Sequence, residues 1–312
     1  MGHLLARSGA EKRFELVEQM AKHYPVAPTC KALDASRSGF YAHRSKPQLP
    51  RRLRDKALKA TIVDIFDQSR GTYGSPRIQQ ELAKRKEPCG KNRTLRLMKE
   101  QNLQPIQKRK YRPMTTDTNH KLAVAPNWVG EIAAADRPNQ IWTSDITYLW
   151  TAQGWLYLAS HMDLFSRRIV GWAVSLSLET DLIQRSLDKA LSGRKPCPGL
   201  IHHSDRGSQY ASRIYRQQLE NNHITCSMSR KGNCYDNAAH ESFWATLKTE
   251  CFGKEVPQSH EQARLMIFSY IEGFYNTRRI HSSLGYLSPD QHELKYHQTF
   301  VEMQRTTTPL AA

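Results

Sequence analysis

Apolar and polar positions along the chain follow two different periods, and the period changes near Gln140. Before that residue, apolar side chains recur every three or four positions, as they do in amphipathic helices. In the last of these helical stretches, Leu95 and Met98 are expected to face inward. The spacing predicts helices over residues 11–23, 28–33, 53–66, 77–85 and 92–101.

A short basic stretch near the start predicts a further helix, over residues 36–41, with Ser36 as its N-cap. Helix, turn and short basic helix form the outline of a helix-turn-helix, a DNA-binding motif. An ordinary small helical bundle would give the same pattern, so this alternative stays open. The prolines Pro47 and Pro50 then indicate a linker before the next helical stretch.

From Gln140 onward, apolar and polar residues alternate or form short β-prone runs, which is typical of strands. Amphipathic helices come between and after the strands, and Thr180 is the expected cap of the first one. The order β-β-β-α-β-α-β-α predicts an α/β fold with a mixed five-stranded sheet flanked by helices. Strands are expected over residues 141–150, 155–163, 168–176, 200–204 and 224–228, and helices over 180–191, 212–221, 237–250 and 260–276.

The formal net charge of +17 is spread unevenly. Residues 1–118 contain 26 Lys and Arg against 11 Asp and Glu, whereas residues 119–312 contain 20 against 18. Basic side chains that neutralise phosphates release counterions, so the excess favours a nucleic-acid partner held mainly by the first part of the chain. A basic surface that only aids solubility is the plainer alternative.

The cysteines and apolar stretches exclude some other classes of protein. None of the six cysteines forms a C-x-x-C pair, and His202 and His203 are adjacent, so no zinc site is predicted. We see no apolar stretch of membrane-spanning length and no signal peptide, so no membrane partner is expected. The thiols are expected to stay reduced, in a cytoplasmic protein that acts on DNA.

Three acidic residues stand where the predicted elements would bring them together. Asp145 lies inside the first strand, Asp205 ends the fourth, and Glu241 lies on the helix after the fifth. A carboxylate inside an apolar strand is costly unless a charge offsets it. If the first and fourth strands are neighbours, the three carboxylates converge. Any three of the 29 acidic residues would pass a loose search, so exposed acids or ion-pair partners remain the alternative.

Converging carboxylates supply the hard oxygen ligands that Mg²⁺ or Mn²⁺ prefers. Two such ions can activate an attacking water or 3′-hydroxyl and stabilise the leaving oxygen of a phosphodiester. Asp145 is the expected bridging ligand, because it projects from the middle of the sheet. Lys248 shares a helical face with Glu241 and is expected to contact DNA phosphate, although an exposed helix lysine is the alternative. Further candidates for DNA contact are Asn237, Arg230 and Lys231.

Several other side chains near the acids allow two interpretations. Tyr210 is expected either to stack on a frayed base or to pack in the core. Arg279 is expected either to touch DNA or to pair with an acid of a long helix. Gly207 is expected to permit a tight loop near DNA. Packing in the core or on the sheet is favoured over base stacking for Trp142, Trp155, Trp172 and Trp244.

Longer motifs surround the three acids: WTSDITY over 142–148, HHSDRGSQY over 202–210, and SRKGNCYDNA over 229–238, which continues through Glu241 to Lys248. A tail motif, YNTRR with HSSLGY, follows over 275–286. In these motifs the chain resembles the DDE transposases of bacterial insertion sequences, specifically the second-reading-frame (OrfB-type) product of the IS-three family with a retroviral-integrase-like catalytic core. The front also resembles the family, through SRSGFY over 36–41 and YGSPRI over 73–78, which makes Arg37 and Arg77 candidate DNA contacts.

The resemblance implies an RNase H-like fold and a Mg²⁺-dependent enzyme with Asp145, Asp205 and Glu241 as its metal ligands. It implies cleavage at the terminal inverted repeats of the element, strand transfer into target DNA, and a homo-oligomer on the DNA of a bacterial nucleoid. The upstream-frame product is an expected partner, because no sustained heptad repeat is present here. A nuclease that does not join, and an inactive transposase-derived DNA-binding protein, are the alternatives.

These patterns together predict five regions along the chain. They are a helical helix-turn-helix-like region at 1–48, a second basic helical DNA-binding region at 49–118, a linker at 119–138, the integrase-like catalytic core with a C-terminal helix at 139–300, and a flexible tail at 301–312.

Overall fold

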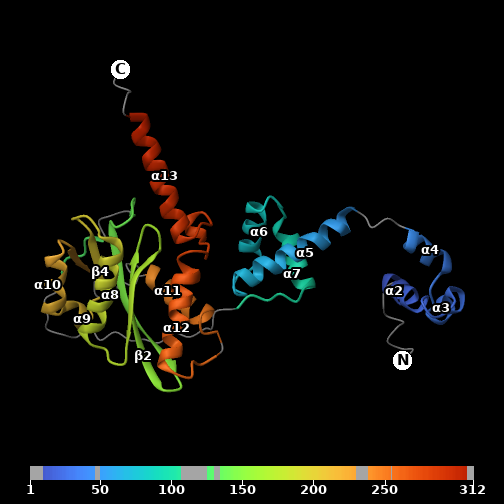
Figure 1. Ribbon diagram of the computed structural model, residues 1–312, viewed down its shortest axis with the longest axis horizontal. Helices are drawn as coiled ribbons and strands as arrows, with labels where there is room; N and C mark the ends of the chain where they lie inside the picture. Colours follow the sequence, from blue (N-terminus) through green and yellow to red (C-terminus); the bar gives the residue numbers. More distant parts are fainter. Residues whose placement is uncertain are drawn as a thin grey trace. The chain divides into compact units, whose positions relative to one another are not determined.

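The computed structural model describes residues 10–45, 50–106, 125–129, 134–229, 238–253 and 255–307 (Figure 1). The chain divides into two compact units, residues 1–63 and 64–312. Within the described residues, no helix is both long enough and apolar enough to cross a membrane.

The first unit is helical, as predicted, and its core is small. Its helices are α2 (Ala10–Met20), α3 (Val26–Ala32), α4 (Arg37–Ser45) and the first part of α5 (Pro50–Gln68). Val17, Cys30 and Phe40 are buried against one another. The Ser36 hydroxyl accepts a hydrogen bond from the Gly39 N–H at 3.2 Å, so the predicted cap of α4 is confirmed.

The second unit begins with the end of α5 and continues through α6 (Ser75–Lys84) and α7 (Lys91–Glu100). Met98 is buried, as predicted, but Leu95 is 41% exposed, so its predicted inward orientation is wrong. Leu97 is fully buried in its place. The inward face of α7 is therefore formed by Thr94, Leu97 and Met98.

Tyr73, in the turn before α6, connects this helical segment to the rest of the unit. Its hydroxyl donates a hydrogen bond to the carbonyl of Arg278 at 3.1 Å and accepts one from the N–H of Ile280 at 2.9 Å. Arg70 adds a hydrogen bond to the carbonyl of Ser269. The two ends of the unit's sequence are thus joined by polar contacts.

A mixed five-stranded sheet forms the centre of the second unit, as predicted, with the strand order β3-β2-β1-β4-β5. β1 pairs antiparallel with β2 and parallel with β4, and β5 continues the parallel side. Antiparallel pairing on one side and parallel pairing on the other makes β1 the central strand. The strands are β1 (Ile141–Thr151), β2 (Gly154–Asp163), β3 (Ile169–Ser175), β4 (Ile201–Ser204) and β5 (Thr225–Met228).

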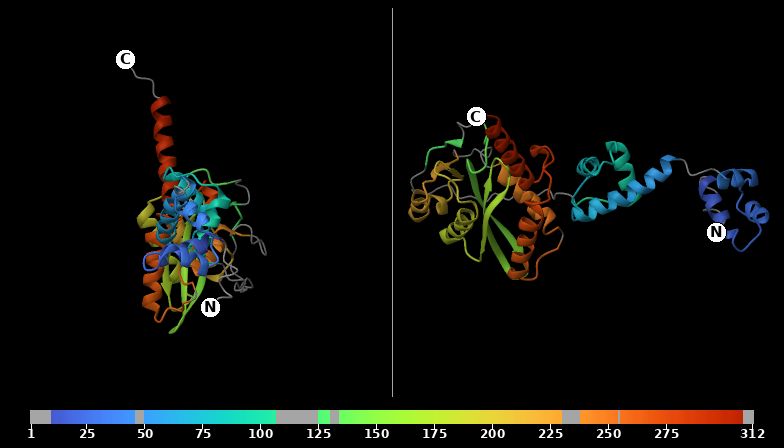
Figure 2. Two further views of the ribbon diagram at one scale, coloured as in Figure 1. Left: turned by 90° about the vertical axis from the view of Figure 1, so that its right-hand side faces the viewer. Right: turned by 45° about the horizontal axis from the view of Figure 1, so that its top comes forward.

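Helices cover both faces of this sheet (Figures 1 and 2). On one face are α8 (Thr180–Arg194), α9 (Ser208–Ala211) and α10 (Arg213–Asn221), and on the other are α11 (Ala238–Glu250) and α12 (His260–Tyr270). Trp142, Leu187 and Tyr215 are buried in the core between β1 and the first group. Fully buried apolar side chains of this size provide the main favourable free energy of folding.

Caps of the helices agree with the sequence in one case and differ in another. The Ser212 hydroxyl accepts a hydrogen bond from the N–H of Tyr215 and caps α10. α8 instead has Glu179 at its N-cap position, without a side-chain hydrogen bond, and Thr180 is already its first helical residue. The predicted Thr180 cap is therefore wrong by one residue.

The C-terminal part is longer and more helical than predicted. A π-helical turn, η3 (Ile271–Tyr275), extends α12, and a 3₁₀ turn, η4 (Ser282–Leu284), precedes α13 (Pro289–Thr307). Residues 301–307 continue α13. Residues 308–312 lie outside the described part of the chain.

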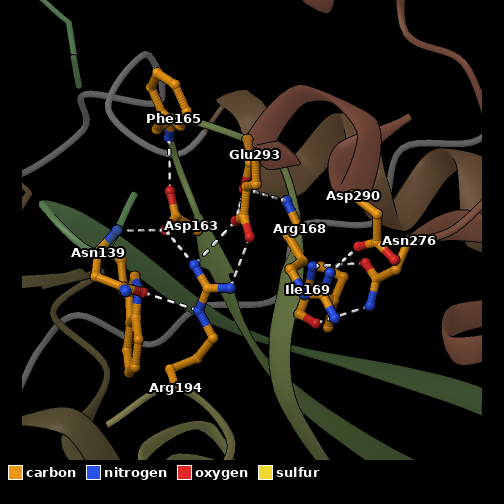
Figure 3. A network of polar contacts seen from close by, with 11 residues as sticks. Asn139, Asp163, Phe165, Arg168, Ile169, Arg194, Asn276, Asp290 and Glu293 are labelled. Atoms are coloured by element: carbon orange, nitrogen blue, oxygen red, sulfur yellow. Dashed lines mark hydrogen bonds and ion pairs between the residues drawn. The ribbon is translucent and has the colours of Figure 1, made fainter. Parts of the chain in front are cut away.

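A polar network joins α13 to the sheet and to α8 (Figure 3). Arg194 donates to both carboxylate oxygens of Glu293, at 2.7 and 2.9 Å, and lies 3.5 Å from Asp163. Asp163 also accepts a hydrogen bond from the N–H of Asn139 at 2.7 Å. Burial raises the pKa of Asp163 to about 6, with the charge of Glu293 adding to the effect and the backbone N–H of Asn139 opposing it.

Candidate active site

Two of the three candidate acids come from adjacent parallel strands, which was the condition for their convergence. β1 and β4 pair from Ile141 opposite Ile201 to Ser144 opposite Ser204. Asp145 directly follows Ser144, and Asp205 directly follows Ser204. Neighbouring strands lie roughly 4.8 Å apart, so the two carboxylates emerge beside each other at the carboxyl end of β4.

The carboxylate of Asp145 accepts one hydrogen bond on each of its two oxygens. Its Oδ1 accepts from the N–H of Ile146 at 2.8 Å, and its Oδ2 accepts from the indole Nε1 of Trp244 at 3.0 Å. Burial, together with the charges of Asp205 and Glu241, raises the pKa of Asp145 to about 7 against the lowering effect of the two hydrogen bonds. A carboxylate with such a pKa gains from a cation close to it.

Asp205 is oriented by the loop that follows β4. Its Oδ1 accepts a hydrogen bond from the N–H of Gly207 at 2.9 Å. A Cβ at Gly207 would lie 3.0 Å from that oxygen, so a side chain there would press on the carboxylate. Arg206 anchors the same loop through a hydrogen bond from its Nε to the carbonyl of Ser229 at 2.8 Å. The tight loop predicted at Gly207 is present, and it positions Asp205.

Glu241 lies in the first turn of α11, where its side chain is exposed. The helix is fixed on the sheet by His240, whose ring is hydrogen bonded to Thr143 at 3.0 Å and to Ser160 at 2.7 Å. Burial lowers the pKa of His240 to about 3, so the ring is neutral. His240 directly precedes Glu241, so this neutral, buried ring sets the position of α11 relative to β1.

The three carboxylates influence one another electrostatically but do not form a closed cluster. Among the described residues, no three His, Cys, Asp or Glu side chains are placed to hold a metal ion directly. Residues 230–237, which lead into α11, lie outside the described part, and they include the candidates Arg230, Lys231 and Asn237.

Trp244 is the residue whose role the sequence did not indicate. It is nearly buried, as expected for a core residue, but its indole N–H also donates to Asp145. A spacing of three residues from Glu241 places it about one turn further along α11, which was the available signal. Tyr210 packs in the core, since it is buried and its hydroxyl is 2.9 Å from the Ser144 hydroxyl.

Lys248 extends the site along β1. Its Nζ lies 5.2 Å from the centre of the Tyr148 ring, a cation–π distance. Burial lowers the pKa of Lys248, and the negative charge of Asp145 opposes that change. Lys248 therefore faces the same region as Asp145, as the helical spacing predicted.

The two candidate contacts in the helical segments have different surroundings. Arg37 is exposed on α4. Arg77 stacks on the Tyr73 ring at 5.5 Å and lines a cavity of about 510 Å³ together with Arg167 and Arg279. Arg279 is paired, but with the last residue of α11 and not with an acid of the predicted long helix: its guanidinium binds both carboxylate oxygens of Glu250, at 2.6 and 2.7 Å.

Family models and relatives match almost the whole chain. Two models described as an integrase core domain match residues 135–234 and 222–289, and one described as an HTH-like domain matches residues 52–111. The helix-turn-helix match thus falls on the second basic region, not on the first.

This chain matches curated relatives over nearly the full length of each relative. A protein of insertion element IS600 from Shigella sonnei, described as an uncharacterized 31 kDa protein, is 44% identical over 86% of this chain and 98% of its own. Transposase InsF for insertion sequence IS3A from Escherichia coli strain K12 is 37% identical over 91% of this chain and 99% of its own. Among solved structures, the HTLV-2 integrase catalytic core domain in complex with magnesium is 16% identical, with a TM-score of 0.39 over 51% of this chain and 98% of that one.

Proposed function

This chain belongs to the IS-three family of insertion-sequence transposases, and on that premise we propose that Asp145, Asp205 and Glu241 are its catalytic carboxylates. The protein is a DDE transposase, a polynucleotidyl transferase of DNA transposition and integration with an RNase H-like core. The observation that supports the assignment best is the register of β1 and β4, in which Ser144 pairs with Ser204 immediately before the two aspartates. Glu241 raises the pKa of the first aspartate from the adjoining helix.

The donor set fits divalent cations. All three side chains offer carboxylate oxygens, and Asp145 is a buried acid whose raised pKa a neighbouring cation would lower. We propose two ions, Mg²⁺ or Mn²⁺, with Asp145 as the shared ligand because it lies on the central strand. When bound, such ions activate the attacking water or 3′-hydroxyl and stabilise the leaving oxygen.

The chain's own groups orient these ligands. The backbone N–H of Ile146 and the indole of Trp244 hold Asp145, and the N–H of Gly207 holds Asp205. Glu241 is exposed in the first turn of its helix and would supply the third carboxylate. The chain itself thus orients two of the three proposed ligands.

DNA is the partner of this enzyme, and the proposed contacts lie on two parts of the chain. Around the acids, Lys248 is proposed to bind a DNA phosphate, and its interaction with the charge of Asp145 supports this position. In the helical regions, the exposed Arg37 supplies a phosphate contact that weakens with salt. The remaining proposed contacts are Asn237, Arg230, Lys231 and Arg77.

We further propose that the substrates are the terminal inverted repeats of the element and a target DNA, bound by a homo-oligomer on the nucleoid. The upstream-frame product of the same element is proposed to contribute recognition of the element ends. The family membership and the net charge of +17 support DNA as the substrate. Purification with and without the upstream product, followed by footprinting on the flanking repeats, tests this part.

The assignment of the acids is tested by cleavage and joining assays on element-end DNA with Mg²⁺ or Mn²⁺. We expect Asp145→Asn, Asp205→Asn and Glu241→Gln each to reduce both reactions at least a thousandfold, while DNA binding is retained. Asp181→Asn is the matched control, since Asp181 is an exposed acid paired with Arg185 on α8. Full activity in any of the three variants contradicts the assignment, and cleavage without joining in the unaltered protein would favour a nuclease.

A further inference from the structure

An exposed aromatic cluster lies on the β1–β2 hairpin, beyond the three acids. Trp150 and Trp155 face each other as a cross-strand pair, with ring centroids 4.9 Å apart, and remain 53% and 50% exposed. Tyr148 packs edge-on against Trp155 at 5.2 Å. Trp155 thus packs against its neighbours on the sheet and not in the core, because its indole lies on the surface at the tip of the hairpin.

The fold of the hairpin does not depend on these exposed rings. At its tip, the Thr151 hydroxyl donates to the carbonyl of Gly154 at 2.8 Å. From outside the hairpin, the Ala152 N–H donates to the carbonyl of Pro257 at 2.9 Å, and Gln153 accepts from the N–H of His260 at 3.0 Å. Backbone pairing and these anchors fix the tip, so two half-exposed indoles call for a ligand that covers them.

The cluster is connected to the acids through Lys248. Pairing of β1 with β4 ends at Ser144, and past that point Lys248 reaches the ring of Tyr148 while interacting with the charge of Asp145. At a rise of roughly 3.3 Å per residue, Trp150 is about 17 Å along β1 from Asp145. This distance corresponds to about five stacked nucleotides at 3.4 Å each, and to fewer in a splayed strand.

Asp145 points to the α11 face of β1, and the rings project from the opposite face. Lys248 thus links the carboxylate site to the exposed rings around the edge of β1, where pairing with β4 has ended. We propose that Tyr148, Trp150 and Trp155 form a stacking platform for unpaired bases of the DNA strand that leads to the carboxylate site, with Lys248 binding an intervening phosphate. The proposal rests on the proposed function of the acids. Aromatic faces bind bases of any sequence, so the platform stabilises a frayed end without reading it.

The test compares two DNA probes in metal-free buffer with the full chain. One is a blunt duplex, and the other is the same duplex with five unpaired nucleotides at one end that carry 2-aminopurine. We expect Trp150→Leu and Trp155→Leu to weaken binding of the forked probe about tenfold each and to abolish quenching of 2-aminopurine, with no change for the blunt probe. Trp155→Phe should retain most of the preference, because a phenyl ring still stacks.

Trp128→Leu is the matched control, since Trp128 is a comparably exposed indole outside the hairpin. Equal loss on both probes, or unchanged preference for the fork, overturns the platform. A change in oligomeric state without a change in fork preference also overturns it and assigns the cluster to a protein contact. Binding is measured without metal, so its result is independent of the cleavage assay. The platform can be refuted while the acid variants still lose cleavage, and the assignment of the acids can be refuted while the fork preference is still lost in the Trp variants.

Discussion

The indole N–H of Trp244 donates a hydrogen bond to Oδ2 of Asp145 across 3.0 Å and so joins α11 to the central strand of the sheet. The contact lowers the pKa of a carboxyl that burial and two other acids raise. It also holds one carboxylate oxygen in a fixed direction. The helix that carries Glu241 therefore positions a second acid through a different side chain.

Replacement of Trp244 by Phe removes this donor and keeps an aromatic ring. We expect Trp244→Phe to shift half-maximal cleavage to about tenfold higher Mg²⁺ concentration, because a hydrogen bond to a charged group contributes roughly 1.5–3 kcal/mol. Trp172→Phe is the control, since Trp172 is equally buried and its indole donates to Glu272 at 2.8 Å. An unchanged Mg²⁺ dependence in Trp244→Phe would show that the contact is only structural.

The raised pKa of Asp145 predicts that its conservative variant is more stable than the unaltered protein without metal. The folded-state pKa, about 7, lies above the ordinary value of 3.8, so the stability that this group contributes is complete below 3.8 and is lost as pH rises through about 7. Asp145→Asn escapes this loss. We expect it to raise the free energy of unfolding by ~2 kcal/mol at pH 8 and by much less at pH 4.

Urea denaturation with a chelator present measures this difference, and Asp181→Asn serves as the comparison on an exposed acid. Addition of Mg²⁺ should stabilise the unaltered protein at pH 8 and leave Asp145→Asn nearly unchanged. A variant that is less stable than the parent at pH 8 would refute the account of Asp145 as a carboxylate in need of a cation.

Two Glu–Arg pairs of similar geometry provide a test of burial. Arg279 and Glu250 approach to 2.6 Å with 6% and 8% of their side chains exposed, whereas Arg264 and Glu261 approach to 2.6 Å with 51% and 61% exposed. We expect Glu250→Gln to destabilise the fold by about 3 kcal/mol, because it leaves a buried guanidinium unpaired. Glu261→Gln should have no measurable effect. Equal shifts of the two denaturation midpoints would contradict this.

Two glycines near α8 should respond oppositely to the same substitution. A Cβ at Gly171 of β3 would lie 2.3 Å from the carbonyl oxygen of Ser186, so Gly171→Ala must push strand and helix apart and should cost about 2 kcal/mol. Gly193, inside α8, has open space where its Cβ would be, and Gly193→Ala should stabilise by roughly 0.5–1 kcal/mol. Thermal denaturation of both variants measures the signs, and a stabilised Gly171→Ala would exclude the close contact.

Periodicity was sufficient to predict the strands and the order in which strands and helices follow one another, because alternation of apolar residues indicates burial on one face. It also placed Asp145 in a strand and Asp205 at a strand end. Whether the two aspartates lie side by side depends on which strands pair, and only the strand order of the folded sheet shows this. The roles of the three acids and the five proposed regions stay predictions.

Side-chain partners far apart in sequence could not be predicted. Glu250 and Arg279 are separated by 28 residues, and the choice between an ion pair and a DNA contact for Arg279 depends on burial in the folded chain. The local sequence around Trp155 looks like that of a buried tryptophan, but its position at the tip of the hairpin exposes it. Local pattern reports the face of an element, whereas tertiary position decides what covers that face.

The last paired rung of β1 and β4, Ser144 opposite Ser204, has a consequence for divergence within the family. The separation of Asp145 from Asp205 is set by backbone hydrogen bonds between two strands, not by the shapes of the side chains around them. Mutations can therefore accumulate in the flanking core without altering that separation, as long as the strands keep their alignment. A single-residue insertion inside β4 would be far more damaging than many substitutions, because it would rotate Asp205 to the opposite face.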